Sequence, residues 1–487
     1  MNTLMLVLIL LPAAAGLCEL LVPRLSSQRA TAGLWALGGS ALSFLCAALV
    51  MAQVAAGAEL ALPGAHLRAD ALGVIVALLA SFLGVIGVAA ARRHLRVDVE
   101  AGRAKAEWLP VLFGCCGFFV AAANWAALTD HLLVLYIAVE ATTLATVLPV
   151  AFYRNRNSWE AGYKYLLLNS LGLAAALMGL TVLYAAAQPT LGAEALSLAT
   201  LTAAGPNLPP LAAGLAGALL ICGFGTKAGL VPLHGWLPDA YQVSPPGFIA
   251  LFSGIGTKIP LVALARVLPP LMAAAPALRP VLLVVAAVTM LFGIMAAFWQ
   301  DDLRRLLGYS SVSQMGYIAM ALAAGGVAGY EAAAYHVVSH GLIKALLFLA
   351  VGEAVLVAGT ARVSELGGRR LPPVIGVTFL LASLGLGGVP PMPAFWSKFQ
   401  VFTATAEAGY GWAAGVAVLT SLLTITTLVR AGARAFLMKP VGEKLERALP
   451  APWMIVLLVV AVFAAGLFPG WMSGFLSTAA AALAKGV

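Results

Sequence analysis

The sequence predicts an all-α membrane protein of about fourteen transmembrane helices. Of its 487 residues, 62% are hydrophobic and 10% are charged, and the mean hydropathy is +0.99. A soluble globular protein carries charge on roughly a quarter of its residues, and a spanning helix needs about twenty apolar residues. Charged and Pro/Gly-rich breaks divide the chain into about fourteen such segments. The polar connections are too short for a soluble domain, and the net charge of +9 is better explained by loop topology than by nucleic-acid binding.

The apolar segments between these breaks give the expected spans. The first one imitates a secretory signal peptide, but it lacks a positively charged start and is therefore assigned as a helix. Only a short tail is expected after Pro469. In chain order, the spans are residues 3–22, 31–56, 71–91, 108–127, 131–151, 162–187, 211–231, 247–268, 280–299, 310–327, 331–357, 373–403, 411–436 and 452–474.

The basic residues sort by side of the membrane. Nineteen of the 28 lysines and arginines follow odd-numbered helices, three lie in connections on the other side, and six lie within helices. The positive-inside rule places the nineteen in the cytoplasm and both termini outside. The nineteen are Arg24, Arg29, Arg92, Arg93, Arg96, Arg103, Lys105, Arg154, Arg156, Arg304, Arg305, Arg362, Arg369, Arg370, Arg430, Arg434, Lys439, Lys444 and Arg447; the three are Arg68, Arg279 and Lys485; the six are Lys164, Lys227, Lys258, Arg266, Lys344 and Lys398.

Residues 222–258 form the stretch most suggestive of function. An apolar helix carries Lys227 at its centre and is broken at Pro232; a polar piece holds His234 and Asp239, and a second apolar helix carries Lys258. Ionisable groups inside spanning segments mark ion or proton paths, and irregular backbone at membrane depth lines protein or water-filled cavities. The stretch therefore predicts a charge-handling site.

A similar interruption occurs in the twelfth expected helix. The sequence LGLGGVPPMPAFWSKF breaks that helix near Lys398, as Pro232 breaks the seventh near Lys227. Two Gly/Pro-interrupted segments at corresponding places in two halves indicate inverted repeats. The expected division is helices 1–3 (residues 1–107), a first five-helix repeat of helices 4–8 (108–270), a second of helices 9–13 (280–440), and helix 14 (450–487).

Glu140 lies near the middle of the fifth expected helix. A carboxyl group in apolar surroundings is neutral unless a cation accompanies it. The alternatives for Glu140 are a water-lined surface or a contact with a neighbouring subunit. Lys227 also has two alternatives to a role in charge handling. Its flexible side chain could extend to the membrane interface, or its amine could bind carbonyl groups freed at the helix break. Lys258 lies mid-helix, where reaching an interface is difficult.

Three polar residues near the first break are secondary candidates. Lys164 lies four residues after Glu160, so it either forms an exposed ion pair with Glu160 or modulates the charge-handling site. His234 is a candidate for proton uptake, because histidine titrates near neutrality. Asp239 either shares that role or bonds a backbone turn.

The eleventh expected helix carries His336, His340 and Lys344, which step by four residues along one face. Two histidines at this spacing can bind zinc, but no glutamate follows His336 and the lysine would repel a cation. A proton wire joining two half-channels is therefore favoured over a metal site.

The sequence contains no sign of a bound cofactor. It has no dinucleotide fingerprint after a strand, no P-loop and no clustered cysteines, so any electron transfer must occur in other chains. The five cysteines are expected to be small core residues. Asp301 and Asp302, together with Arg304 and Arg305, are expected to form a solvated cytoplasmic loop without a role.

The motif KAGLVPLHGWLPDA, followed by an apolar helix with a central lysine, resembles the proton-conducting membrane transporter family. That family comprises antiporter-like subunits of respiratory complex I, of energy-converting membrane-bound hydrogenases and of multi-subunit Na+/H+ antiporters. The resemblance implies a glutamate–lysine pair, a second lysine, a histidine-bearing helix and a terminal lysine, where some members have glutamate. The implied proton relay is Glu140, Lys227, Lys258, His340 and Lys398, with Lys164, His234, Asp239, His336 and Lys344 as secondary candidates.

By this resemblance, the chain is a non-redox, proton-translocating subunit of a complex I-like or hydrogenase-like complex in a prokaryotic plasma (inner) membrane. It would have no catalytic centre, and it would work with other antiporter-like and small membrane subunits. Iron–sulfur, flavin or nickel cofactors would belong to its partners. The HGWLPDA form and the compact length favour this reading. The alternatives are a subunit of a multi-subunit Na+/H+ antiporter and, from a different class, an intramembrane metal enzyme at His336 and His340.

Overall fold

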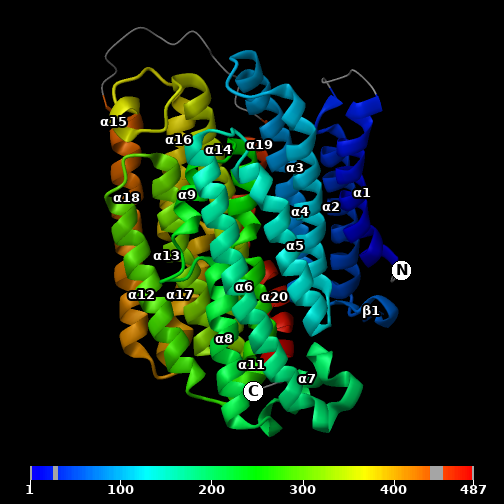
Figure 1. The fold of residues 1–487 in the computed structure, drawn as a ribbon. Coiled ribbons are helices and arrows are strands. Elements are labelled where there is room, and N and C mark those ends of the chain that lie inside the picture. The colour runs from blue at the N-terminus through cyan, green and yellow to red at the C-terminus, as the bar shows by residue number, and fades with distance from the viewer. Residues whose placement is uncertain (1–2, 26–30, 439–452, 485–487) are drawn as a thin grey trace.

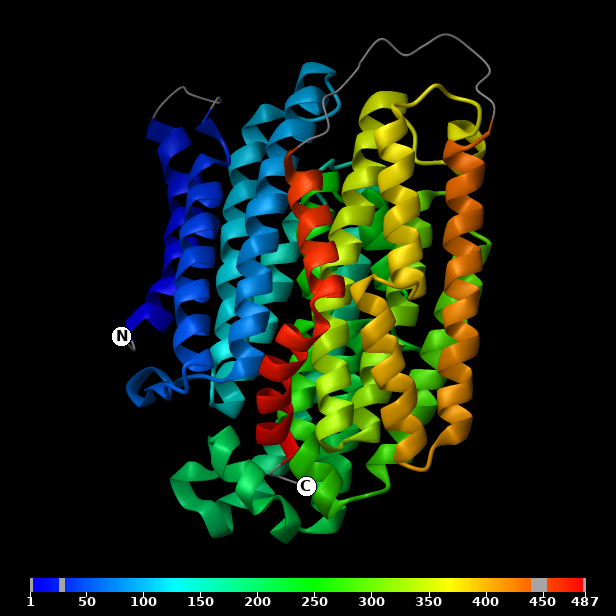
Figure 2. The ribbon, with the colours of Figure 1, turned by 180° about the vertical axis from the view of Figure 1, so that it is seen from behind.

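The computed structural model describes residues 3–25, 31–438 and 453–484. Arg29, Lys439, Lys444, Arg447 and Lys485 lie outside these ranges, as do the ends of the domains expected at 440 and 450. The described chain is almost entirely helical, and its helices pack side by side in one bundle (Figures 1 and 2). A hairpin of two antiparallel strands, β1 (Leu60–Leu62) and β2 (Leu67–Ala69), lies at the same end of the bundle as α7.

Eleven of the described helices are long and apolar enough to cross a membrane, or twelve if the pair α19 and α20, bent by 77°, is one span. The fold class is therefore the expected one. Fewer than the expected fourteen helices of the described chain, however, meet the criteria of length and hydropathy individually. The helices are α1 (Thr3–Leu25), α2 (Leu34–Ala55), α3 (Ala71–Glu100), α4 (Leu109–Leu128), α5 (Leu132–Val150), α6 (Arg156–Leu191), α7 (Leu198–Ala204), α8 (Pro210–Ala228), α9 (Trp236–Val243), α10 (Pro246–Leu251), α11 (Ile259–Ala274), α12 (Leu278–Phe298), α13 (Leu303–Ala324), α14 (Gly326–Ala358), α15 (Val363–Leu366), α16 (Pro373–Gly387), α17 (Pro393–Glu407), α18 (Gly411–Phe436), α19 (Trp453–Leu467) and α20 (Pro469–Ala484).

The first predicted interruption is present, but its geometry differs from the expectation. Lys227 lies in the last turn of α8, which ends at Ala228, and Gly229 follows with a φ of +83°. A positive φ suits glycine because it has no Cβ atom. The polar piece is not irregular throughout, since it contains α9. A π-helix, η6 (Phe252–Gly256), then separates α10 from α11, and Lys258 lies directly before α11.

The second predicted interruption separates α16 from α17. Gly388 has a φ of +90° and ends α16, and Pro393 begins α17. Lys398 lies in the second turn of α17. Each interruption therefore places a lysine next to a helix end inside the bundle.

Several boundaries differ from the sequence expectation. Helix α3 continues to Glu100, so Arg92, Arg93 and Arg96 lie on its last turns and not in a loop. Arginine is a good helix former, which explains the extension. The residues after Pro469 form α20 and not a short tail, because proline is favourable in the first turn of a helix. Cys222, expected in the core, is exposed.

Helix α14 is the centre of the second half of the bundle. It is buried along most of its length and packs against α3, α10, α13, α16, α17, α19 and α20. Close helix contacts depend on small residues; for example, a Cβ atom on Gly247 of α10 would lie 2.0 Å from the backbone of Ala91 on α3. The histidines and the lysine of α14 are therefore held in a densely packed core.

Candidate functional site

Lys227 is held by two hydroxyl groups from neighbouring helices. Its side chain is buried, and its Nζ donates to Thr143 Oγ1 of α5 at 2.5 Å and to Tyr165 Oη of α6 at 3.1 Å. The ammonium also lies 5.4 Å from the centre of the Tyr165 ring. The end of α8 thus presents one cation to α5 and α6.

Glu140 lies one turn before Thr143 on α5. It interacts electrostatically with Lys227 and lies near Thr143. Its Oε2 is buried without a hydrogen-bond partner in the protein. Within the described residues, no Glu140–Lys227 ion pair shorter than 4.0 Å is formed. Thr143 therefore accepts the lysine hydrogen bond that a direct ion pair would give to Glu140.

Lys258 is buried completely and has no carboxylate partner among the described residues. Its Nζ donates to the carbonyl oxygen of Ser253, within the π-helix η6. Because a π-helix shifts the backbone hydrogen-bond pattern, it can leave carbonyl groups available to side chains. The neighbouring hydroxyls of Ser253 and Thr257 are buried without partners in the protein.

An aromatic cluster lies between the surroundings of Lys227 and Lys258. Tyr165 and Tyr241 both pack against Phe252 of the π-helix, with ring centres 5.8 Å and 5.4 Å away. The Tyr241 hydroxyl lies near Thr257, which precedes Lys258. The cluster thus carries two hydroxyl groups, that of Tyr165 bonded to Lys227 and that of Tyr241 near Thr257.

His336 and His340 are fully buried on α14, with nearly parallel rings 6.1 Å apart. His336 Nδ1 lies 2.9 Å from Ser397 Oγ of α17, whereas neither ring nitrogen of His340 has a hydrogen-bond partner among the described residues. Among the described residues, no three histidine, cysteine or acidic side chains are grouped as metal ligands would be.

Lys344 and Lys398 each donate to uncharged oxygens. Lys344 Nζ bonds the Leu307 carbonyl at 2.6 Å and Ser310 Oγ at 2.5 Å. Lys398 Nζ bonds the Gly387 carbonyl at 3.4 Å and Ser421 Oγ at 3.2 Å. The oxygens of α13 and of the α16 end therefore stabilise two further buried amines.

Tyr317 connects Lys398 to the histidines. Its ring stacks on His336 at 5.5 Å and lies 4.8 Å from Lys398 Nζ. Lys258 and Lys398 both act electrostatically on His336 and His340. The structure therefore brings Lys258, the two histidines and Lys398 into one interacting group, with Lys344 beside it.

Lys164 lies away from this group, at the end of the bundle where α3 ends and α13 begins. We call this the basic end, because Arg93, Arg103, Arg304 and Arg305 lie there. Lys164 is 45% exposed and pairs with Glu160 at 2.7 Å, as its spacing predicts. It also pairs with Asp239 of α9 at 3.1 Å.

Asp239 joins the two halves of the chain. Besides Lys164 of α6, it binds Arg305 of α13 at 2.9 Å. A cavity of about 460 Å³ surrounds this cluster, and its lining includes Tyr153, Asn155 and Gln242. Asp239 lies on α9 and does not cap a turn there; His234 is half-buried, 4.7 Å from the Phe292 ring.

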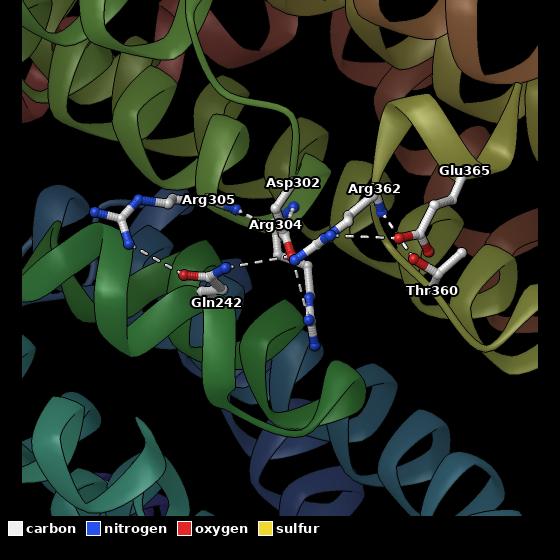
Figure 3. A network of polar contacts seen from close by, with 7 residues as sticks. All are labelled: Gln242, Asp302, Arg304, Arg305, Thr360, Arg362 and Glu365. Atoms are coloured by element: carbon white, nitrogen blue, oxygen red, sulfur yellow. Dashed lines mark hydrogen bonds and ion pairs between the residues drawn. The ribbon is translucent and has the colours of Figure 1, made fainter. Parts of the chain in front are cut away.

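The expectation of a solvated loop without a role at Asp301 and Asp302 is met only in part: Asp301 is exposed and both acids lie outside the helices, but each makes specific contacts. Asp302 caps α13 by accepting from the backbone amides of Arg304 and Arg305 at 2.9 and 3.2 Å. Asp301 accepts from the Ser364 hydroxyl at 2.6 Å. Figure 3 shows the network around Asp302, in which Arg305 extends to Gln242, at 3.1 Å, and Arg304 takes another direction. These acids fix the start of α13 against the segment that leads into α15.

Sequence reasoning missed the hydroxyl partners of the site. Thr143 and Tyr165 at Lys227, Tyr241 near Thr257, and Tyr317 at Lys398 were not singled out. The available signal was spacing, since Thr143 lies one helical turn from Glu140 on the same face. Tyr165 follows Lys164 directly, but nothing in the sequence says which of the two faces inward.

Comparison with known proteins places the chain in a family. Residues 129–424 match the family described as NADH:quinone oxidoreductase/Mrp antiporter, TM. Subunit N of the NADH-quinone oxidoreductase of Desulforudis audaxviator is 34% identical, covering 83% of this chain and 82% of that one. A hydrogenase-4 component F homolog of Methylacidiphilum infernorum is 31% identical, covering 70% and 73%.

Two further similarities are informative. A subunit of the Na(+)/H(+) antiporter of Alkalihalophilus pseudofirmus is 27% identical, covering 77% of this chain and 73% of that one. A chain of the archaeal membrane-bound sulfane sulfur reductase has the same fold, with a TM-score of 0.88 at 22% identity and coverage of 99% and 97%. The chain therefore belongs to the NADH:quinone oxidoreductase/Mrp antiporter transmembrane family.

Proposed function

We propose that this chain is the proton-translocating, antiporter-like membrane subunit of a redox complex. The observation that carries the proposal is the row of four buried titratable groups, Lys227, Lys258, His340 and Lys398, that follows the partly buried Glu140. Burying charged or titratable groups in a membrane is costly, and a folded core of apolar residues would not require four of them. A proton path uses this arrangement directly.

The first part of the relay is a switch between two partners of Lys227. In the structure the ammonium donates to Thr143, next to a carboxylate that lacks a partner at Oε2. A small rotation would allow Lys227 to bind Glu140 directly, which stabilises the charged lysine. Separation of the two would favour release of the lysine proton. Alternation between these arrangements loads and unloads one proton.

The second part of the relay leads from Lys258 past His340 to Lys398. Buried polar atoms without protein partners, such as both ring nitrogens of His340, are ordinarily bonded to internal water. Water between these groups would connect them as a proton wire. Tyr317, which touches His336 and Lys398, would position Lys398 beside the histidines of α14.

The topology we propose has fourteen spans. It counts α8 with α9, α10 with α11, α16 with α17, and α19 with α20 as single spans, and it adds α13, whose serines and glutamine lower its hydropathy. Both termini then face outward. The interruptions beside Lys227 and Lys398 support two inverted repeats at 108–270 and 280–440, after helices 1–3 (1–107) and before the last helix (450–487).

Thr143 offers a direct test of the switch. Replacing it by valine keeps the shape but removes the oxygen that accepts from Lys227. A lost buried hydrogen bond costs about 1–3 kcal/mol, so we expect proton translocation by the reconstituted complex to fall at least about fivefold. Thr426→Val, on an exposed position of α18, is the matched control. Equal rates in Thr143→Val and wild type would contradict the switch.

The relatives favour a redox complex over a cation/proton antiporter. Two relatives above 30% identity are a subunit of an NADH-quinone oxidoreductase and a homolog of a hydrogenase component, and the Na(+)/H(+) antiporter relative is more distant at 27%. We therefore expect other antiporter-like and small membrane subunits as partners. Redox cofactors would belong to partner chains, with no catalytic centre in this one.

The identity of the partners can be measured directly. The complex, gently extracted through a tag on this chain, would be analysed by mass spectrometry and elemental analysis. We expect partners that carry iron–sulfur clusters, flavin or nickel. Recovery of small membrane subunits alone, without iron, would indicate the cation/proton antiporter instead.

A further inference from the structure

A second buried titratable cluster lies at the basic end, between α3 and α14. Glu353 of α14 is 3% exposed and binds Arg93 Nη2 at 3.1 Å. Its other oxygen lies 3.3 Å from His94 Nε2. His94 is 2% exposed, and within the described residues neither of its ring nitrogens has a hydrogen-bond partner. The cluster joins residues 260 positions apart in the chain.

A cavity of about 460 Å³ reaches this cluster. Its lining includes His94, Asp98 and Arg103 of α3, together with Tyr153 and Arg304. Asp98 binds Arg103 at 2.7 Å and accepts from the Tyr153 hydroxyl at 2.6 Å.

This cavity adjoins the one around Lys164 and Asp239. Both are lined by Tyr153, Asn155 and Arg304. Arg305, next to Arg304, contacts Gln242 in the Asp239 cavity (Figure 3). The two cavities thus form a polar vestibule with two arms, one ending at Asp239 and the other at His94.

An ion pair that simply ties α3 to α14 does not explain this arrangement fully. Arg93 and Glu353 alone would make that tie. The buried imidazole beside the same carboxylate adds a second titratable group, and buried polar atoms are rarely left without a partner. His94 therefore joins the Arg93–Glu353 ion pair to a cavity that it helps to line at the basic end.

We propose that His94 and Glu353 form a second proton-loading site, which takes protons from the vestibule and supplies the α14 part of the relay. A proton from vestibule water binds the carboxylate–imidazole pair, and Arg93 stabilises the carboxylate after the proton leaves. The proposal rests on the proton-translocating function proposed above. It adds an uptake arm that does not pass through Glu140 and Lys227.

Lys344 is the receiving group on α14. It precedes Glu353 by nine residues, about 13 Å along the helix axis, so water must carry the proton between them. Its two hydrogen-bond partners, Leu307 and Ser310, belong to α13, whose Arg304 lines the vestibule. Helix α13, which binds the amine of Lys344, therefore also borders the vestibule.

The test uses the complete complex in proteoliposomes, with proton translocation measured as a function of pH. Glu353→Gln keeps a side chain that can bind Arg93 but cannot ionise, and we expect translocation to fall about twofold or more, with a changed pH profile. Glu353→Asp should restore most of the loss. His94→Gln, which leaves the Arg93–Glu353 contact intact, should also lower translocation. Glu365→Gln is the control, because Glu365 pairs with Arg362 on the exposed surface.

The outcomes separate this inference from the proposed function. If the wild-type complex translocates no protons, the proposed function itself fails. If the wild type translocates protons and both Glu353→Gln and His94→Gln match it at every pH, the loading site is wrong. If Glu353→Gln only reduces the amount of assembled complex, while His94→Gln behaves as wild type, the cluster is a structural tie and the inference is overturned.

Discussion

Lys227→Met should nearly abolish proton translocation by the assembled complex. Methionine has a similar length and suits a buried helix, so α8 should keep its packing. The substitution removes the amine that donates to Thr143 and Tyr165 and interacts with Glu140. Loss of a proton-transfer group costs about 100-fold or more in catalysis. We therefore expect redox-driven acidification of vesicles to fall at least about tenfold, measured with a fluorescent pH probe.

The control for this variant is Lys105→Met. Lys105 is 78% exposed and lies near Glu107 at 3.9 Å, so its loss should leave translocation unchanged. Assembly of the complex would be checked by subunit content. Normal acidification in an assembled Lys227→Met complex would remove Lys227 from the relay.

Lys258→Met is expected to have an effect of comparable size. Lys258 is buried completely, donates to the Ser253 carbonyl and acts electrostatically on His336 and His340. Without it, the Glu140–Lys227 switch would lack an acceptor for its proton. We expect at least about tenfold slower acidification in the same vesicle assay.

Lys258→Arg distinguishes a relay role from a structural one. Arginine keeps the positive charge and the hydrogen bonds but does not release its proton. The relay predicts slow acidification in both variants. Recovery of the wild-type rate in Lys258→Arg would mean that Lys258 only stabilises the π-helix by its charge.

The interruptions of the helices were predictable because their chemistry is local. Glycine and proline mark chain breaks wherever they interrupt an apolar run, and the breaks after Gly229 and Gly388 follow such marks. The position of Lys227 was less predictable. Whether a helix ends soon after a lysine or continues to the next proline depends on tertiary contacts, such as that between Gly229 and Leu237.

The partners of the buried lysines could not be read from the sequence. A threonine or tyrosine can lie on any face of an apolar helix at little cost in free energy. Nothing in the sequence therefore distinguishes Thr143 and Tyr317 from other polar residues of their helices. The α3–α14 cluster was hidden for a different reason. The third expected span ends at residue 91, because a charge run after an apolar segment usually ends a membrane helix, whereas α3 continues past Arg93 and His94 to Glu100.

The number of helices that qualify as membrane spans by hydropathy depends on the polar residues buried inside the bundle. Helix α13 contains Ser310, Ser311, Ser313 and Gln314, all buried. These residues lower its hydropathy, although the helix packs in the core against α12 and α14. A rule based on apolar length therefore undercounts helices whose polar side chains are buried in the bundle.

The number of protons translocated per electron is the measurement that tests the relay most directly. It would be determined in proteoliposomes for the wild-type complex and for Lys227→Met, with Lys105→Met beside them. The relay predicts a lower ratio in Lys227→Met and an unchanged ratio in Lys105→Met. A wild-type ratio in Lys227→Met, with normal subunit content, would contradict the claim that protons pass through this row of buried groups.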